Sequence, residues 1–230
     1  MSQFIQKMFT EVPCTYKLLN HLLTFGQDIF WRRRAARVAA AGGGTLWLDA
    51  CSGTGDMATC LSRLARDGTN IVAVDFSLPM MRKAMKNSNV KRIAFTLADV
   101  GCLPFQDNCF DGIIISFATR NITLTKDNLL KCLQEFYRVL KPNGQFVNLD
   151  TSQPKFAPIR WMFHLYTKGV VRPIGRLISG SDAAYTYLSH SIRHFYSPEK
   201  LAEIIHQAGF CEVRFKRMLF GVATIHTAIK

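Results

Sequence analysis

Residues 45–56 read TLWLDACSGTGD, and this stretch decides the fold. Its apolar part, Leu46 to Leu48, has the character of a buried central strand. The residues after Asp49 are small, and Asp56 opens a segment with helical spacing, MATCLSRLARD. The stretch therefore predicts a strand, a small-residue turn and a helix. In open α/β sheets, ligands bind outside the carboxyl ends of the strands, beside such turns.

Apolar strands and amphipathic helices continue to alternate as far as residue 150. Further strands are predicted at 71–74, 93–98, 112–117 and 145–149. Helices are predicted at 78–87 and 126–140, the second of them stopped by Pro142 and Gly144. Strands that alternate with helices build a mostly parallel sheet with right-handed crossovers, so the sequence predicts an α/β fold.

The segments on either side of this core differ from it in pattern. The last N-terminal helix opens at Asp28 and ends at the glycines 42–44, and a helix capped by Ser197 precedes a closing hairpin. The predicted division is an N-terminal helical cap at 1–44, a core at 45–150, a helical lid at 151–196, and a closing helix and β-hairpin of the same domain at 197–230.

Basic residues give the chain a net charge of +13 and a pI near 9.7. Such a chain is attracted to polyanions, either nucleic acid or an anionic membrane surface, although solubility alone also explains the charge. We interpret the lid as an interfacial element, with an ordinary surface helix as the alternative. The basic positions concerned are Arg32, Arg33, Arg34 and Arg37 in the cap, and Arg160, His164, Lys168, Arg172 and Arg176 in the lid.

The cysteines and the apolar runs indicate the compartment. The chain has seven cysteines, an odd number without a C-x-x-C pair, which favours a reducing compartment and no structural metal. No run approaches the roughly 20 apolar residues that cross a bilayer. The N-terminal segment MSQFIQKMFTEV has no long apolar stretch, so we expect no signal peptide. We expect a cytoplasmic protein that can work at the inner face of the membrane without spanning it.

Carboxylates follow three predicted strands at one edge of the sheet: Asp49, Asp75 and Asp99. They argue against a phosphate ligand, because a carboxylate would repel a pyrophosphate at a helix N-terminus. Asp75 can accept both hydroxyls of a ribose, as it could in a nicotinamide dinucleotide site too. Asp99 can accept an adenine amino hydrogen while the Val100 N–H meets a ring nitrogen. An adenosine ligand with positive charge, S-adenosylmethionine (SAM), suits this edge.

The turn after the first strand supports the same ligand. The pattern D-x-x-x-G-x-G, from Asp49 to Gly55, resembles motif I of the class I SAM-dependent methyltransferases. Gly53, Thr54 and Gly55 keep the turn small enough for its backbone to approach a ligand. Cys51 stands where many members of that class have a glycine.

Longer motifs resemble one methyltransferase family over nearly the whole chain. YKLLNHLLTFGQDIFWR (16–32) and RVLKPNGQFVNLDTSQP (138–154) resemble its two signatures, and LPFQDNCFD, ISFATRN, DAAYTYLSHSI (182–192) and GVATIHTAIK are similar to further segments. The chain thus resembles the ubiquinone/menaquinone biosynthesis C-methyltransferase family (UbiE-type). The resemblance implies a Rossmann-like, seven-stranded, mostly parallel sheet with helices on both faces, together with N-terminal helices and a helical lid.

The resemblance also implies roles for individual residues. Arg120 and Asn121 would lie beside the transferred methyl group, and Tyr16 matches a tyrosine at the lip of the substrate site. No metal is implied. The residues implied to bind SAM are Asp49, Gly53, Thr54 and Gly55 in the turn, Asp75 at the ribose, Asp99 and Val100 at the adenine, and Ser116 near the methionine end.

The chain departs from the family pattern at several positions. Lys17 stands where the family has an acid and Asp28 where it has a histidine, which reverses charges near the substrate entrance. Asn143 replaces a glycine and Asp150 a glutamate, and Asp99 replaces a common asparagine. The ring type of the quinone precursor, naphthoquinol or benzoquinol, therefore stays open.

The implied reaction is methylation of a ring carbon of a demethylated isoprenoid quinol. Deprotonating a ring hydroxyl makes the adjacent carbon nucleophilic, and that carbon attacks the SAM methyl group. A guanidinium is a poor base, so we expect Arg120 to stabilise the oxyanion or orient a water, and Asn121 to bond the hydroxyl. His190 and His194 are further candidate bases.

Three alternatives compete with this interpretation. The acceptor could be another small aromatic or lipid molecule, or the chain could be a non-catalytic binding subunit with a SAM fold. A nucleic-acid methyltransferase would carry an N-P-P-[YF]-like motif or a catalytic cysteine where this chain has SFATRN. We expect an isoprenoid quinol and an anionic membrane surface as partners, no nucleic acid, and leave a homodimer open.

Overall fold

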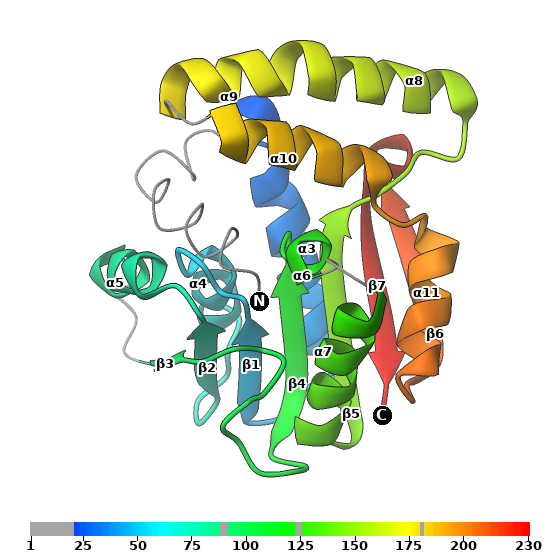
Figure 1. Cartoon of the computed structure of the whole chain (residues 1–230). Coiled ribbons are helices and arrows are strands. Elements are labelled where there is room, and N and C mark those ends of the chain that lie inside the picture. The colour runs from blue at the N-terminus through cyan, green and yellow to red at the C-terminus, as the bar shows by residue number, and fades with distance from the viewer. Residues whose placement is uncertain (1–20, 88–91, 123–125, 180–181) are drawn as a thin grey trace.

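The computed structural model describes residues 21–87, 92–122, 126–179 and 182–230 (Figure 1). Tyr16 lies outside the described residues, so its role at the lip of the substrate site stays a prediction.

The described strands form one seven-stranded sheet in the order β3-β2-β1-β4-β5-β7-β6. Strands β1 to β5 are parallel, while β7 runs antiparallel to both of its neighbours. Chain order reverses between β1 and β4, and in such sheets the ligand crevice lies at this switch point. The strands are β1 (Leu46–Ala50), β2 (Asn70–Asp75), β3 (Ile93–Leu97), β4 (Phe110–Ser116), β5 (Leu140–Thr151), β6 (Cys211–Met218) and β7 (Ala223–Ile229).

Helices cover both faces of the sheet, as predicted (Figure 1). The helices that flank the sheet are α3 (Gln27–Ala41), α4 (Asp56–Ser62), α5 (Leu78–Asn87), the short α6 (Thr119–Ile122), α7 (Lys126–Val139) and α11 (Pro198–Gln207). Ile114 of β4 packs in one core with Trp31 of α3, whereas Ile113 and Ile115 pack in the other with Phe136 of α7. Successive residues of a strand face opposite sides, so a continuous apolar run is what a strand covered on both faces requires.

The lid segment crosses above the carboxyl ends of the parallel strands (Figure 1). It contains α8 (Ala157–Tyr166), a π-helical turn (Thr167–Val171), α9 (Arg172–Ser179) and α10 (Asp182–His194). Gly169 lies in the π-helical turn and Pro173 in the first turn of α9. Gly175 continues the helix, because glycine weakens a helix but keeps its N–H and does not break it.

Several predicted boundaries were wrong by a few residues. Helix α4 ends at Ser62 rather than extending through the following LARD segment. Strand β5 begins at Leu140, ahead of Pro142, and not at the predicted residue 145. The register of its pairing with β4 shifts between Phe110 and Gly112. Asn143 has a φ of 62°, the left-handed region that glycine adopts most easily, which fits the glycine of the family pattern.

None of the helices within the described residues combines the length and the hydrophobicity that crossing a membrane requires.

Candidate active site

The turn between β1 and α4 adopts a left-handed backbone at several positions. Cys51 has a φ of 54°, Gly53 of 55° and Gly55 of 76°. A Cβ at Gly53 would meet no atom within 4 Å, so the backbone there faces open space. A Cβ at Gly55 would lie 3.0 Å from the Cβ of Ala84, so this glycine allows α4 and α5 to pack closely. Only the first half of the turn is therefore free to approach a ligand.

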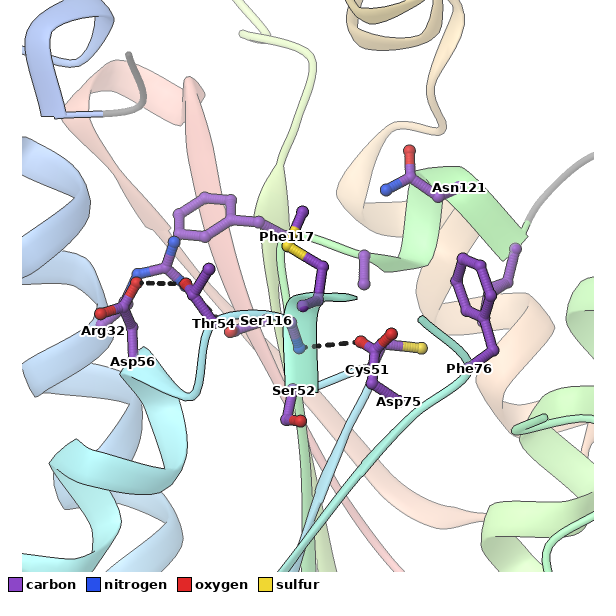
Figure 2. Close-up of a pocket in the computed structure, with 14 residues that line it drawn as sticks. Arg32, Cys51, Ser52, Thr54, Asp56, Asp75, Phe76, Ser116, Phe117 and Asn121 are labelled. Carbon is purple, nitrogen blue, oxygen red and sulfur yellow. Dashed lines mark hydrogen bonds between the residues drawn. The ribbon is translucent and has the colours of Figure 1, made fainter. Parts of the chain in front are cut away.

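Asp75, at the end of β2, fixes this turn. One carboxylate oxygen accepts from the Gly53 N–H at 2.8 Å (Figure 2). The other accepts from the Ser77 N–H, also at 2.8 Å. A carboxylate has about four lone-pair sites in all, and the Phe76 backbone N–H also interacts with this one, so part of its acceptor capacity remains for a ligand. Burial raises the pKa of Asp75, and the hydrogen bonds from Ser77 and Gly53 oppose that shift.

The turn opens into a cavity of about 590 Å³, which we call the loop cavity. Its charged groups are Arg32, Asp56 and Asp75. Figure 2 shows them around the same space as Ser116 and Asn121. The lining residues are Arg32, Cys51, Ser52, Gly53, Thr54, Asp56, Asp75, Phe76, Met80, Ser116, Phe117, Ala118, Asn121 and Ile122.

Arg32 is buried although it belongs to the basic cluster of the cap. Its Nη1 donates to the Ser116 Oγ at 3.1 Å, and its guanidinium lies 4.8 Å from the centre of the Phe117 ring. The interpretation of this cluster as a solvated or anion-contacting face is therefore wrong for Arg32, whereas Arg33 and Arg37 are exposed. The signal in the sequence is the i, i+4 spacing from Asp28, which places both side chains on one side of α3.

Asp49 does not line the loop cavity. It is fully buried, and its Oδ2 accepts from the Ala58 N–H at 2.8 Å, which ties β1 to α4. Burial raises the pKa of Asp49 to about 8, which favours the neutral form of its carboxyl group. A direct contact of Asp49 with a ligand cation stays a prediction that this position does not favour.

Asp99 lies at an adjoining cavity of about 590 Å³, which shares Asn121 and Ile122 with the loop cavity. Its Oδ1 accepts from the Gly101 N–H at 2.8 Å. The Val100 side chain is buried in the core, so only its backbone is available for a ligand. This arrangement agrees with an adenine site that extends from Asp75 toward Asp99.

A second cavity of about 970 Å³ lies beneath the lid, and we call it the apolar cavity. It shares Arg32 and Phe117 with the loop cavity, so the two cavities have a common wall. Its only charged lining groups among the described residues are Asp28, Arg32 and Arg120. The lining residues are Leu23, Thr24, Phe25, Asp28, Trp31, Arg32, Phe117, Arg120, Thr151, Phe163, Tyr166, Thr167, Val171, Leu188, Ile192, Leu219 and Val222.

The two residues predicted beside the methyl group lie on either side of the common wall. Asn121 lines the loop cavity and Arg120 the apolar cavity. Arg120 is buried, and its Nη1 donates to the Asp150 Oδ1 at 2.6 Å. The Arg120 backbone N–H also donates to the second oxygen of Asp150, at 3.2 Å. Asp150 thus balances the charge of a guanidinium that faces the apolar cavity.

The candidate bases His190 and His194 line neither cavity. Both are exposed on α10, with their rings stacked 4.0 Å apart. Their role as bases stays a prediction, and their position outside both cavities does not favour it.

The residues present fit SAM. The backbone at Gly53 faces open space, and Asp75 beside it retains acceptor capacity for a ribose hydroxyl. The buried Ser52 Oγ has no hydrogen-bond partner among the described residues. SAM carries a carboxylate as well as its cations, and Arg32 supplies a guanidinium at the same cavity.

Comparisons with known proteins identify the family of the chain. The sequence model of the ubiE/COQ5 methyltransferase family matches residues 1–230. The chain is 39% identical over 221 residues to a demethylmenaquinone methyltransferase of Thermus thermophilus, which covers 95% of the chain and 98% of that protein. It is 35% identical to the ubiquinone/menaquinone biosynthesis C-methyltransferase UbiE of Desulfotalea psychrophila, covering 98% of the chain and 90% of that protein.

Solved structures show the same fold at lower identity. A SAM-dependent methyltransferase of Thermotoga maritima, described as a possible histamine N-methyltransferase, aligns with a TM-score of 0.69 and 17% identity. The alignment covers 98% of this chain and 99% of that one. The fold is therefore that of the SAM-dependent methyltransferases, and the chain belongs to the ubiE/COQ5 methyltransferase family.

Proposed function

We propose that this SAM-dependent methyltransferase methylates a ring carbon of a demethylated isoprenoid quinol. The observation that carries the proposal is the common wall of the two cavities, Arg32 and Phe117. A polar donor in the loop cavity and an apolar aromatic acceptor in the apolar cavity would meet at this wall. The names of the two curated relatives support a quinone precursor as the acceptor.

Different residues of the loop cavity bind different parts of SAM. Asp75 accepts the ribose hydroxyls, Arg32 pairs with the carboxylate of the methionine end, and Asp56 attracts its ammonium group. When bound, SAM supplies an electrophilic methyl group. The enzyme holds the two reactants in contact and excludes water, which accounts for much of the rate in such transfers.

Arg120 acts from the acceptor side. A ring hydroxyl that loses its proton becomes an oxyanion, and a buried guanidinium stabilises such a charge far better than one in water. Asp150 holds the Arg120 side chain in place and keeps the pair neutral before the acceptor arrives. Asn121 offers a hydrogen bond from the side of the loop cavity.

A labelled-methyl assay tests the proposed function. The enzyme is incubated with methyl-labelled SAM and either demethylmenaquinol, a demethylated benzoquinol or an unrelated phenol of similar acidity. We expect label in the ring of one quinol class and at least tenfold less in the phenol. Equal label in all three acceptors, or label in the phenol alone, would show that the enzyme has another acceptor.

We further propose that the lid docks on an anionic membrane surface, from which the quinol enters. Large apolar side chains on the outside of the lid are exposed, among them Trp161 (66%), Met162 (63%) and Leu165 (54%), and the basic Arg160 lies among them. Phe163 and Tyr166 of the same helix line the apolar cavity. A helix with an apolar outer face and basic neighbours can bind an anionic bilayer, and the net charge of +13 also favours such binding.

Leu165→Ser is expected to weaken co-sedimentation with anionic vesicles about tenfold, because burial of a leucine contributes roughly 1.5–3 kcal/mol. Leu97→Ser is the matched control, since Leu97 has the same 54% exposure on the edge strand β3, away from the lid. Binding that is insensitive to vesicle charge, or an equal loss in both variants, would contradict docking through the lid.

A further inference from the structure

Methylation of a ring carbon needs a base, and the apolar cavity offers one group that can serve. Among the described residues that line it, Asp28 is the only carboxylate, and no histidine or cysteine lines it. The hydroxyl of Tyr166 is engaged, because it donates to the Leu23 carbonyl at 2.7 Å. Arg32 and Arg120 are cations that cannot accept a proton.

Asp28 is held in a defined orientation. It is 1% exposed, and both of its oxygens lie within hydrogen-bond distance of the His21 Nδ1, at 2.7 and 2.9 Å. The Thr24 hydroxyl donates to the same carboxylate at 2.9 Å. The Arg32 Nε lies 3.8 Å from it, one helical turn further along α3. Asp28 therefore lies one turn from the wall that the two cavities share.

His21 connects this buried carboxylate to solvent. Its side chain is 28% exposed, whereas that of Asp28 is 2% exposed. Carboxylate and imidazole in contact form a unit that can take a proton from the cavity and release it to water. The groups that face this unit are Thr24 beside it, Arg32 on α3, Tyr166 on α8 and Arg120 on α6.

We propose that Asp28 is the general base that accepts the ring-hydroxyl proton of the acceptor, with His21 as its positioning residue. The inference rests on the proposed function. The hydroxyl O–H bond breaks, and its proton goes to the Asp28 carboxylate. The electron pair left on the oxygen enters the ring, and the adjacent carbon forms the new bond to the methyl group. The methyl–sulfur bond breaks, and its electron pair stays on the sulfur.

The ring then regains its aromaticity without a further reagent. Asp28 returns its proton to the ring oxygen, and the ring C–H proton leaves to water. One proton is released per methyl group transferred. Arg120 on α6 faces the oxyanion that exists before the methyl transfer, while the base Asp28 lies on α3, so these two groups come from different elements of the cavity wall.

The decisive variant is Asp28→Asn, assayed over pH with quinols of different hydroxyl acidity. We expect kcat to fall about 10²–10⁴-fold, the usual contribution of a positioned base. Because only acceptor ionised in bulk water would then react, the rate should rise nearly tenfold per pH unit. The loss of kcat relative to the parent enzyme should also be smaller for acceptors with a more acidic hydroxyl. The Kd for SAM, measured by calorimetry without acceptor, should change less than threefold.

Asp56→Asn is the matched control, since Asp56 is also an acid in the first turn of a helix that lines a cavity. This variant should change the Kd for SAM. The dependence of its kcat on the acidity of the acceptor should be the same as in the parent enzyme. His21→Asn tests the same proposal without altering a buried side chain. The amide can still donate to Asp28 but cannot pass a proton on to water, so we expect a loss of about tenfold in kcat with the Kd for SAM unchanged.

The outcomes separate the inference from the proposed function. If the parent enzyme methylates no quinol, the proposed function fails and the assignment of Asp28 fails with it. If the parent is active and Asp28→Asn keeps kcat within threefold, only the assignment of Asp28 fails. A loss that is the same for every acceptor and every pH would identify Asp28 as a structural residue and would also overturn the assignment.

Discussion

Asp75→Ala is expected to weaken the binding of SAM at least 100-fold. Two hydrogen bonds to a charged carboxylate contribute roughly 1.5–3 kcal/mol each, and 1.4 kcal/mol corresponds to a factor of ten. The substitution also removes the acceptors of the Gly53 and Ser77 N–H groups, so the turn loses its anchor. Calorimetric titration of the variant with SAM measures the change in Kd.

A ligand analogue separates these two effects. A SAM analogue without both ribose hydroxyls should bind the parent enzyme and Asp75→Ala with Kd values within about tenfold of each other, because neither complex can form the ribose contacts. Asp99→Asn is the matched control at the next strand and should change the Kd less than threefold, since asparagine retains an acceptor oxygen. If Asp75→Ala bound SAM as tightly as the parent, the ribose would lie elsewhere.

The fold could be predicted from the sequence because each strand carries its own local signal. The run Ile113–Ile115 indicates a strand covered on both faces, and Ser197 with Pro198 indicates the start of α11, where Ser197 accepts from the Lys200 N–H. The start of β5 was missed for a physical reason. Its pairing with Phe110 crosses an irregular register around Pro142 and Asn143, and a long-range pairing leaves no local pattern.

The positions of the candidate residues at the cavities could be predicted where they depend on chain order, and less well where they depend on packing. The strand ends placed Asp75 and Ser116 at the loop cavity, as the sequence suggests. The burial of Asp49 could not be predicted, because it depends on the contact with Ala58 of α4. The positions of Arg32 and Asp28 at the cavities could not be predicted, because the pattern of their segment is typical of a solvated basic helix. Only the packing of α3 against β4 and the lid shows that they face the cavities.

The second large effect is expected for the buried pair Arg120–Asp150. Arg120→Ala should lower the free energy of unfolding by roughly 3–5 kcal/mol, because it leaves the Asp150 carboxylate buried without its guanidinium. A double variant, Arg120→Met with Asp150→Asn, removes both charges. The side-chain oxygen of the new asparagine can still accept from the backbone N–H of residue 120. This double variant should recover most of the lost stability in a denaturant titration.

Stability and activity should separate in that double variant, and this separation decides what Arg120 does. If the guanidinium stabilises the oxyanion of the acceptor, the double variant should bind SAM normally and still lose at least 100-fold in kcat, since it is folded but lacks the charge. If Arg120 only holds α6 to β5, the recovered fold should recover the activity as well. A buried ion pair contributes little net stability compared with apolar side chains of similar size, so its presence at the wall of an otherwise apolar cavity argues that the charge is retained for the reaction.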